Sequence, residues 1–434
     1  MLNSFAKKFE NTYALQEGQN IAVACSGGVD SMVLCHLLLQ LDIPFCVLHC
    51  NFHLRGEDSN DDAAFVRRFA EKHLLEFDQI DFDTRSYAKE KGISIQMAAR
   101  ELRYEWFDKI KREKNISWVA TAHHLDDDIE TVLINIGRGT GIRGVVGIPD
   151  KDNGFIRPLL SFTKEQILRF AEANNIVWRE DKSNLSTDYL RNYLRHKVIP
   201  VWKEEVSDLP IGFKNTKNHL MQTLQLQRDY LELIKNQVCT STDFGIQINL
   251  NQLNSFPNTS ALLYELLFPF GFTAWEDIFH LENAQSGKMI LSDTHRLIKD
   301  RDNLLLSEKQ INRNIKSIYL RNQQELEDMS IILAKLTAKV FKFETKRTIF
   351  VSEKKISFPL ELRRWKAGDF FYPAGMTGKK KLSKYFKDEK YSLLEKEAIW
   401  VLCCKNEIVW VVGHRADRRF LPNKPEEATI KITI

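Results

Sequence analysis

The chain has 434 residues, of which 43% are hydrophobic and 28% charged, and its formal net charge at pH 7 is +4. These values are typical of a globular protein of two or three domains and exclude a disordered chain or a strongly basic body. There is no apolar run long enough to cross a bilayer, no secretion signal, and no Cys-x-x-Cys spacing among the seven cysteines. We therefore expect a cytoplasmic protein with reduced thiols and no membrane partner.

The first informative stretch runs from Ile21 to Leu39. Its apolar start predicts a buried strand, and the apolar segment after Ser31 predicts a buried helix. The loop between them reads Ser26, Gly27, Gly28, Val29, Asp30, Ser31. Two glycines let backbone amides approach a phosphate, and the helix that follows directs its positive end at the same anion. We predict a phosphate-binding loop, with an ordinary strand-to-helix turn as the alternative. The loop is not a Walker A loop, because it lacks the lysine of that motif.

The next elements alternate between strands and helices. Apolar runs predict strands at Phe45–His49, Phe77–Phe82 and Trp118–Ala122, and helical spacing predicts helices at Glu57–His73 and Ile95–Lys114. This alternation is typical of parallel βαβ units, whose ligand site lies beyond the carboxyl ends of the strands.

A second cluster of polar residues follows the strand at Trp118. It begins with His123 and His124 and continues with Asp126, Asp127, Asp128 and Glu130. If a helix begins near Leu125, these carboxylates converge on one side and could hold magnesium, bind an amine or accept its proton. Acidic residues in the first turn are also good helix starters, which is the structural alternative. Arg103 lies on the preceding predicted helix. The default interpretation is that it belongs to a basic face exposed to solvent.

These segments carry a resemblance. The Ser26 loop resembles the pyrophosphate loop of the N-type ATP pyrophosphatases, or PP-loop superfamily, and other segments are similar to the tRNA(Ile)-lysidine synthetase family within it. The matching segments are His49–Arg55, Ala99–Tyr104, Ala120–Thr131, Arg138–Gly141, Arg157–Leu160, Asp181–Pro200, Leu362–Asp388 and Trp410–Phe420.

The resemblance implies a reaction. ATP adenylates the 2-carbonyl oxygen of the wobble cytidine in a tRNA(Ile) with a CAU anticodon, and free L-lysine then displaces AMP, which changes codon specificity from AUG to AUA. It implies ATP and Mg²⁺ as cofactors. Asp30 is expected to hold the metal, and Arg103 to steady the adenylate. Asp127 and Glu130 are expected to bind and orient lysine, and His123 and His124 to contact the nucleotide.

We expect an α/β fold in which a Rossmann-like open parallel sheet carries the PP-loop. The expected domains are a catalytic domain at residues 1–210, a small helical tRNA-binding domain at 211–310 and a C-terminal α+β tRNA-binding domain at 349–434. Residues 312–348 are not assigned to any domain.

Basic residues outside the loop are candidates for RNA contact. Lysines alternate with Tyr385 and Phe386, and cations for phosphates combined with aromatics for bases suit an RNA surface, although a solvated loop is the usual fate of such a run. Arg191, Asn192 and Arg195 could equally serve phosphates or tie a helix to the sheet. The remaining candidates are Arg363, Arg364, Lys379, Lys380, Lys381 and Lys384.

Other functions use the same loop. A PP-loop tRNA thiolase acting on a cytidine or uridine needs paired catalytic cysteines or a cluster, for which Cys46 and Cys50 are a poor substitute. A glutamine-dependent ligase needs a glutaminase or dimerising domain, and a non-enzymatic RNA-binding protein would not need the loop intact. Whether the protein is a homodimer is left open by the sequence.

Overall fold

The structure is a computed structural model that describes residues 1–434 except 14–17, 181–189, 310–316, 330–347 and 425. The chain divides into two units, Met1–Gln227 and Arg228–Ile434. Within the described ranges, no helix is both long enough and apolar enough to span a membrane.

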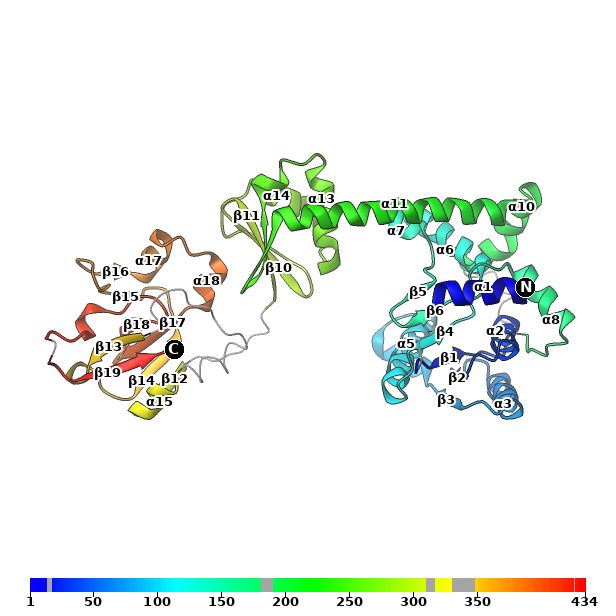
Figure 1. The fold of residues 1–434 in the computed structure, drawn as a ribbon, viewed down its shortest axis with the longest axis horizontal. Helices are drawn as coiled ribbons and strands as arrows, with labels where there is room; N and C mark the ends of the chain where they lie inside the picture. The colour runs from blue at the N-terminus through cyan, green and yellow to red at the C-terminus, as the bar shows by residue number, and fades with distance from the viewer. Residues whose placement is uncertain (14–17, 181–189, 310–316, 330–347, 425) are drawn as a thin grey trace. The chain divides into compact units, whose positions relative to one another are not determined.

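The first unit is built on a six-stranded sheet with the strand order β3-β2-β1-β4-β6-β5 (Figure 1). Neighbouring strands are parallel except for the edge hairpin of β5 and β6. The strands are β1 (Ile21–Ala24), β2 (Phe45–Asn51), β3 (Phe77–Asp81), β4 (Trp118–Ala120), β5 (Lys151–Asp152) and β6 (Phe155–Ile156). The predicted open parallel sheet is confirmed, and the carboxyl ends of β1, β2 and β4 share one edge.

Helices cover both faces of this sheet. Ile21 and Val23 of β1 pack into a core with helices α1, α2, α3 and α8, whereas Ala22 packs with Trp106 and Phe107 of α5 on the other face. The helices are α1 (Leu2–Tyr13), α2 (Val29–Gln40), α3 (Glu57–Lys72), α4 (Thr84–Lys91), α5 (Ile95–Glu113), α6 (Leu125–Gly137), α7 (Ile142–Val145), α8 (Lys164–Ala173), α9 (Leu190–Tyr193), the π-helical turn η2 (Leu194–Val198) and α10 (Ile199–Glu205).

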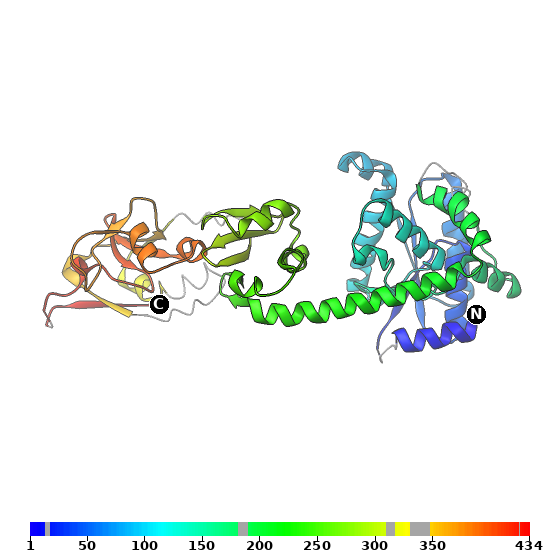
Figure 2. The ribbon, with the colours of Figure 1, turned by 90° about the horizontal axis from the view of Figure 1, so that it is seen from above.

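A long helix, α11 (Leu209–Val238), begins in the first unit, ends in the second and runs as one unbroken helix in Figure 2. After it comes an antiparallel sheet with the order β7-β8-β11-β10-β9. The strands are β7 (Cys239–Thr242), β8 (Gly245–Asn249), β9 (Met289–Leu291), β10 (His295–Asp300) and β11 (Asn303–Glu308). The helical elements are α12 (Leu250–Leu253), α13 (Thr259–Leu267), η3 (Phe268–Phe270) and α14 (Trp275–Leu281).

This sheet corrects the prediction of a small helical domain at 211–310. Helices are present there, but they pack on five strands around a shared core that includes Ile248, Leu297 and Leu304. Each strand is only three to six residues long. Apolar runs this short do not distinguish a strand from a buried helix by periodicity, and distant pairing decides the outcome.

The C-terminal part has the expected α+β character, with a four-stranded antiparallel sheet in the order β12-β14-β17-β18 and two smaller pairs, β13-β19 and β15-β16. The strands are β12 (Ser317–Leu320), β13 (Thr348–Ser352), β14 (Leu360–Arg364), β15 (Phe370–Phe371), β16 (Lys380–Lys381), β17 (Trp400–Cys404), β18 (Glu407–Val411) and β19 (Thr429–Thr433). The helices are α15 (Gln323–Glu327), η4 (Glu353–Lys355), α17 (Leu382–Asp388), α18 (Leu393–Ala398) and η5 (Arg418–Phe420).

Part of the unassigned stretch 312–348 is now placed, because residues 317–329 contain β12 and α15 and residue 348 begins β13. The rest of that stretch, and residues 181–189 of the matching segment Asp181–Pro200, lie outside the described residues.

Candidate active site

The predicted phosphate-binding loop joins β1 to α2 at the carboxyl edge of the sheet. Gly27 has φ +84°, a conformation that favours glycine, and a Cβ atom there would lie 3.3 Å from Cγ2 of Val66. The hydroxyl of Ser31 donates to the carbonyl of Gly28 at 2.9 Å, and the amide of Ser26 donates to that hydroxyl at 3.3 Å. The loop is therefore held in shape by its own serine.

A buried histidine supports the loop from the neighbouring strand. Nδ1 of His49, on β2, lies 2.9 Å from the carbonyl oxygen of Cys25, the residue just before the loop. Burial lowers the pKa of His49, so the neutral ring that can donate this hydrogen bond is favoured. This residue of the segment His49–Arg55 thus positions the start of the loop.

Asp30 lies in the first turn of α2 and meets two groups from distant segments. Its carboxylate oxygens are 2.6 and 2.8 Å from Nζ of Lys164, the first residue of α8. Nε2 of His124 is 3.9 Å from Oδ1 of Asp30. The glycine loop and the second polar cluster are therefore adjacent, as the shared edge of the parallel strands requires.

The two histidines follow β4 and differ in their surroundings. Nδ1 of His123 lies 2.9 Å from the hydroxyl of Thr121, and burial lowers the pKa of His123 to about 4. The ring of His124 lies among carboxylates, with Nε2 at 3.4 Å from Asp127 and Nδ1 at 3.7 Å from Asp126. The backbone amide of His124 also donates to Asp127 at 3.0 Å, which caps the start of α6.

Every carboxylate of this region is paired with a cation from a later helix. We call Asp30, Asp126, Asp127, Asp128 and Glu130 the acidic cluster. Their partners are Lys164 for Asp30, Lys203 for Asp126, Arg195 for Asp127, Lys217 for Asp128, and both Arg191 and Arg195 for Glu130. These cations come from α8, α9, η2, α10 and α11. Pairing of this kind is what permits carboxylates to be buried.

Glu130, like Asp128, has no exposed surface. Arg195 contacts it through Nε at 2.6 Å, and Nε of Arg191 lies 3.0 Å away. Burial raises the pKa of Glu130, and the charge of Arg195 opposes that effect. Through these contacts Arg191 and Arg195 connect α9 and η2 to helix α6, not to the sheet itself. Asn192 lies between them in the sequence, on α9. A role of these three residues toward phosphates stays a prediction.

Arg103 is exposed on α5, and its guanidinium lies over the ring of Phe52 at 5.2 Å from the ring centroid. Phe52 directly follows β2, so Arg103 stands at the same edge of the sheet. Its positive charge helps to lower the pKa of His123, after burial and other charges, which places the two side chains in one electrostatic environment. The position is compatible with the predicted contact to an adenylate.

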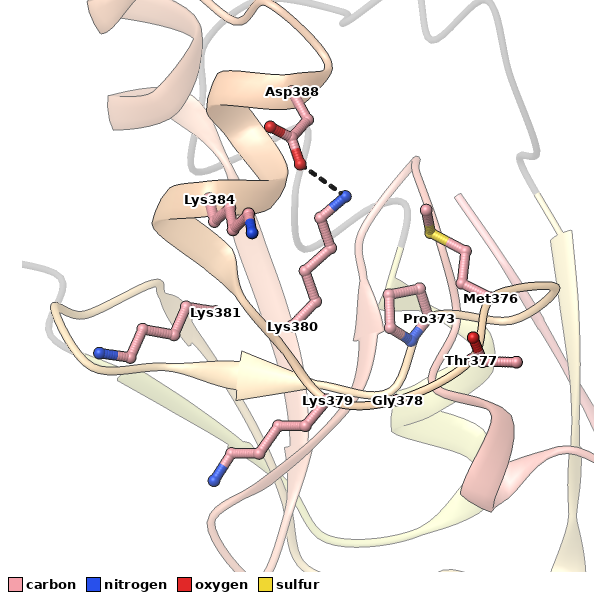
Figure 3. Close-up of a pocket in the computed structure, with 9 residues that line it drawn as sticks. All are labelled: Pro373, Met376, Thr377, Gly378, Lys379, Lys380, Lys381, Lys384 and Asp388. Atoms are coloured by element: carbon pink, nitrogen blue, oxygen red, sulfur yellow. Dashed lines mark ion pairs between the residues drawn. The ribbon is translucent and has the colours of Figure 1, made fainter.

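The C-terminal lysines surround a pocket of about 380 Å³ (Figure 3). Lys380 is paired with Asp388 at 2.9 Å, and Nζ of Lys379 lies 3.5 Å from the centroid of the Phe370 ring. Lys381 and Lys384 are exposed. Figure 3 shows Lys379 and Lys381 extending away from the Lys380–Asp388 pair. The predicted basic surface therefore exists, with three exposed lysines.

Several neighbours predicted to share in RNA contact are placed inside the domain instead. Tyr385 and Phe386 belong to a hydrophobic core, because α17 turns one face inward, so they cannot stack on bases. Arg363 is buried and bonds Asp369 with two N–H groups at 2.8 and 2.9 Å. Arg364 lies over Trp400, and burial lowers its pKa to about 10. The predicted roles of these aromatic rings and of Arg363 in RNA binding do not fit their burial.

Sequence reasoning missed the lysines that complete the acidic cluster, namely Lys164, Lys203 and Lys217. Nothing in their local sequence distinguishes them from solvated lysines on helices. Their partners lie 134, 77 and 89 residues away, so only the folded chain brings the charges together.

Family models place these features in a known class. A PP-loop domain matches residues 1–202, a TilS substrate binding domain matches residues 241–309 and a TilS substrate C-terminal domain matches residues 360–433. The glycine loop at the carboxyl edge of a parallel sheet and the first of these matches define the first unit as an ATP-using domain of the PP-loop class.

Relatives define the family more narrowly. The chain is 40% identical over 441 residues to the tRNA(Ile)-lysidine synthase of Parabacteroides distasonis, covering 100% of this chain and 99% of the relative. It is 37% identical over 428 residues to that of Bacteroides thetaiotaomicron, with coverages of 98% and 97%. Identity to the Bacillus subtilis protein is 31% over 436 residues, with coverages of 94% and 92%. The chain belongs to the tRNA(Ile)-lysidine synthase family.

The pKa of His123 generates a prediction about acid stability. The unfolded chain binds a proton at this residue below about pH 6.5, whereas the folded chain stays neutral there down to about pH 4. The free energy of unfolding should therefore fall as the pH drops through this window. His123→Gln should remove at most about 3 kcal/mol of that fall, measured by urea unfolding at several pH values.

Because His219 on α11 is exposed, His219→Gln is the matched control for replacing a histidine that is not buried. A His123→Gln profile as steep as that of the parent protein would contradict a neutral buried His123.

Proposed function

We propose that this protein is an ATP-dependent ligase that joins free lysine to the 2-position of the wobble cytidine in a tRNA(Ile) with a CAU anticodon. The proposal depends chiefly on one observation. A PP-loop lies next to the acidic cluster at the carboxyl edge of the sheet, in a chain related over its full length to tRNA(Ile)-lysidine synthases. The product, lysidine, would change codon specificity from AUG to AUA, and the reaction belongs in the cytoplasm, where tRNA is modified.

The first step activates the base. A cytosine carbonyl carbon is a poor electrophile, so its oxygen is first joined to the α-phosphate of ATP while pyrophosphate leaves. Backbone amides of the loop and the positive end of α2 would favour the negative charge of the departing pyrophosphate. Arg103, exposed beside the loop's edge of the sheet, is the candidate to hold the adenylate phosphate.

Magnesium fits this loop as a partner of nucleotide phosphates. Among the described residues there is no group of three or more His, Cys, Asp or Glu side chains arranged to hold a metal by themselves. Mg²⁺ is commonly bound through one or two carboxylates together with phosphates and water, which a single aspartate at a PP-loop can provide. Asp30, whose side chain is 29% exposed, is the proposed ligand, and the ion would neutralise charge on the leaving pyrophosphate.

The second step brings the ε-amine of lysine to C2 of the adenylated cytidine, and AMP leaves. The incoming ammonium must be bound and must lose a proton. Asp127 retains 16% side-chain exposure, whereas Glu130 has none. Of the two predicted carboxylates, Asp127 is therefore better placed to contact the amine. Glu130 acts indirectly, because it positions Arg195.

A thiolase is less well supported. Cys46 and Cys50 both lie on β2, and burial raises the pKa of their thiols to about 11 and about 12. At neutral pH both are protonated and therefore weak nucleophiles. Cys46 and Cys50 therefore do not form an activated pair of thiols, whereas the acidic cluster provides carboxylates suited to an amine.

Incubating the protein with ATP, Mg²⁺, unmodified tRNA(Ile) and labelled lysine tests the proposal directly. The label should enter the tRNA, with one AMP and one pyrophosphate released for each lysine joined. A tRNA with the wobble cytidine replaced by uridine is the matched control and should stay unlabelled. If folded protein leaves the label free under these conditions, the proposed function is wrong.

Replacing Asp30 separates activation from RNA binding. Asp30→Ala should abolish detectable pyrophosphate release, because both the proposed metal ligand and the partner of Lys164 are lost. Affinity for tRNA, measured by filter binding, should change less than about threefold, which is the range of a perturbed exposed contact. Equal losses of both activities in a folded variant would argue that the loop and the RNA surface are not independent.

The exposed lysines of the C-terminal pocket should contribute to RNA affinity. Lys379, Lys381 and Lys384, replaced together by alanine, should weaken tRNA binding and reduce the slope of log affinity against log salt by about 2 to 3, for three lost phosphate contacts. Lys380 is left in place because it is paired with Asp388. A matched triple change at the exposed Lys354, Lys424 and Lys431 should leave the slope unaltered. Identical slopes for both triple variants would remove the pocket from the RNA footprint.

A further inference from the structure

The PP-loop contains no cation of its own, and its one charged residue, Asp30, is negative. The triphosphate of ATP carries several negative charges, and in a Walker A loop a lysine within the loop meets them. Here a cation from outside the loop, the ammonium group of Lys164, lies against it. It contacts both carboxylate oxygens of Asp30, at 2.6 and 2.8 Å, although it lies 134 residues further along the chain.

The backbone of Lys164 is fixed independently of its side chain. Its amide donates to Oδ2 of Asp126 at 2.7 Å, so α8 is anchored on the acidic cluster. Thr163 caps the helix, since its hydroxyl accepts from the amide of Gln166 at 3.2 Å and its amide donates to the Gln166 side chain at 3.0 Å. The side chain of Lys164 is 37% exposed. The backbone of Lys164 is therefore held in place, while its ammonium group can change partners.

Other cations near the loop are committed elsewhere. The backbone amide of Arg179 donates to the carbonyl of Gly27 at 3.0 Å, but its guanidinium pairs with Asp62. Arg195 is held between Asp127 and Glu130. Among these side chains, Lys164 is the one whose charge rests directly on a residue of the loop.

We propose that Lys164 binds the β- and γ-phosphates of ATP, and so provides from α8 the cation that the loop lacks. In the structure its ammonium group is held by Asp30; on nucleotide binding it exchanges this carboxylate for phosphate oxygens, while Asp30 turns to the metal. This inference rests on the proposed function and extends it, because it assigns a substrate-binding residue outside the loop. The alternative is a structural lysine that only neutralises Asp30.

Ligands that differ in their phosphates distinguish these two roles. Affinities of the full chain for ATP, inorganic pyrophosphate and AMP are measured by calorimetry with Mg²⁺ present. Lys164→Met should weaken binding of ATP and pyrophosphate about 10- to 100-fold, the range for a lost charge-assisted hydrogen bond, and leave AMP binding unchanged. Lys164→Arg should keep most of the affinity. Arg169→Met, which breaks an exposed ion pair with Glu165 on the same helix, should leave pyrophosphate binding unchanged.

A double-mutant cycle without metal gives a second test, in which the expected change is a gain of pyrophosphate affinity and not a loss. In EDTA, Asp30→Asn should increase pyrophosphate affinity, because Lys164 is released from its carboxylate. The increase should largely disappear when Asp30→Asn is combined with Lys164→Met. Thermal unfolding of each variant verifies that the protein is folded.

Three results would overturn the role of Lys164. They are unchanged pyrophosphate affinity in Lys164→Met, an equal loss of AMP and pyrophosphate binding, or an equal gain from Asp30→Asn with and without Lys164. Failure of the proposed function is distinguishable, because it would appear in the parent protein as lysine that stays out of the tRNA.

Discussion

The burial of carboxylates at the start of α6 is the constraint on which the first unit depends. Asp126, Asp128 and Glu130 have little or no exposed surface, and unpaired charges in that position would be very unfavourable. Their cations come from α9, η2, α10 and α11, so these helices must approach the start of α6. Removing one partner of such a pair costs roughly 3 to 5 kcal/mol, because it leaves the other charge buried alone. The same pairs therefore stabilise the fold and shape the site.

This arrangement changes how the site is expected to bind a charged substrate. A cluster of free carboxylates would attract a lysine ammonium by its net negative charge. Here each carboxylate already has a cation, so an incoming amine or phosphate must exchange partners with a side chain of the protein. Asp127, between His124 and Arg195, and Asp30, bonded to Lys164, are the two places where exposed surface permits that exchange. Specificity then depends on which partners can move.

The C-terminal pocket shows how a local pattern can be right about charge and wrong about aromatic rings. Lysines that alternate with Tyr385 and Phe386 predicted a mixed RNA surface. Because α17 is amphipathic, with Leu382 and both rings on its buried face, the rings instead form the core of the domain. Lys384 remains on the exposed face of α17, and Lys381 is exposed at the N-cap of this helix. Helical periodicity was sufficient to foresee this division, since positions 382, 385 and 386 lie on one side of a helix.

The sequence by itself determined the strand, glycine loop and helix around Asp30, the parallel sheet and the position of the histidines and carboxylates after β4. These features depend on backbone preferences and on periodicity over a few residues, which can be read locally. Only the tertiary structure decided the cation that meets each carboxylate, the burial of Arg363 and the sheet that follows α11. Lys164 reaches Asp30 across 134 residues, and the sheet forms from short strands that pair at a distance. Such contacts are set by the approach of distant segments, and a local pattern does not encode that approach.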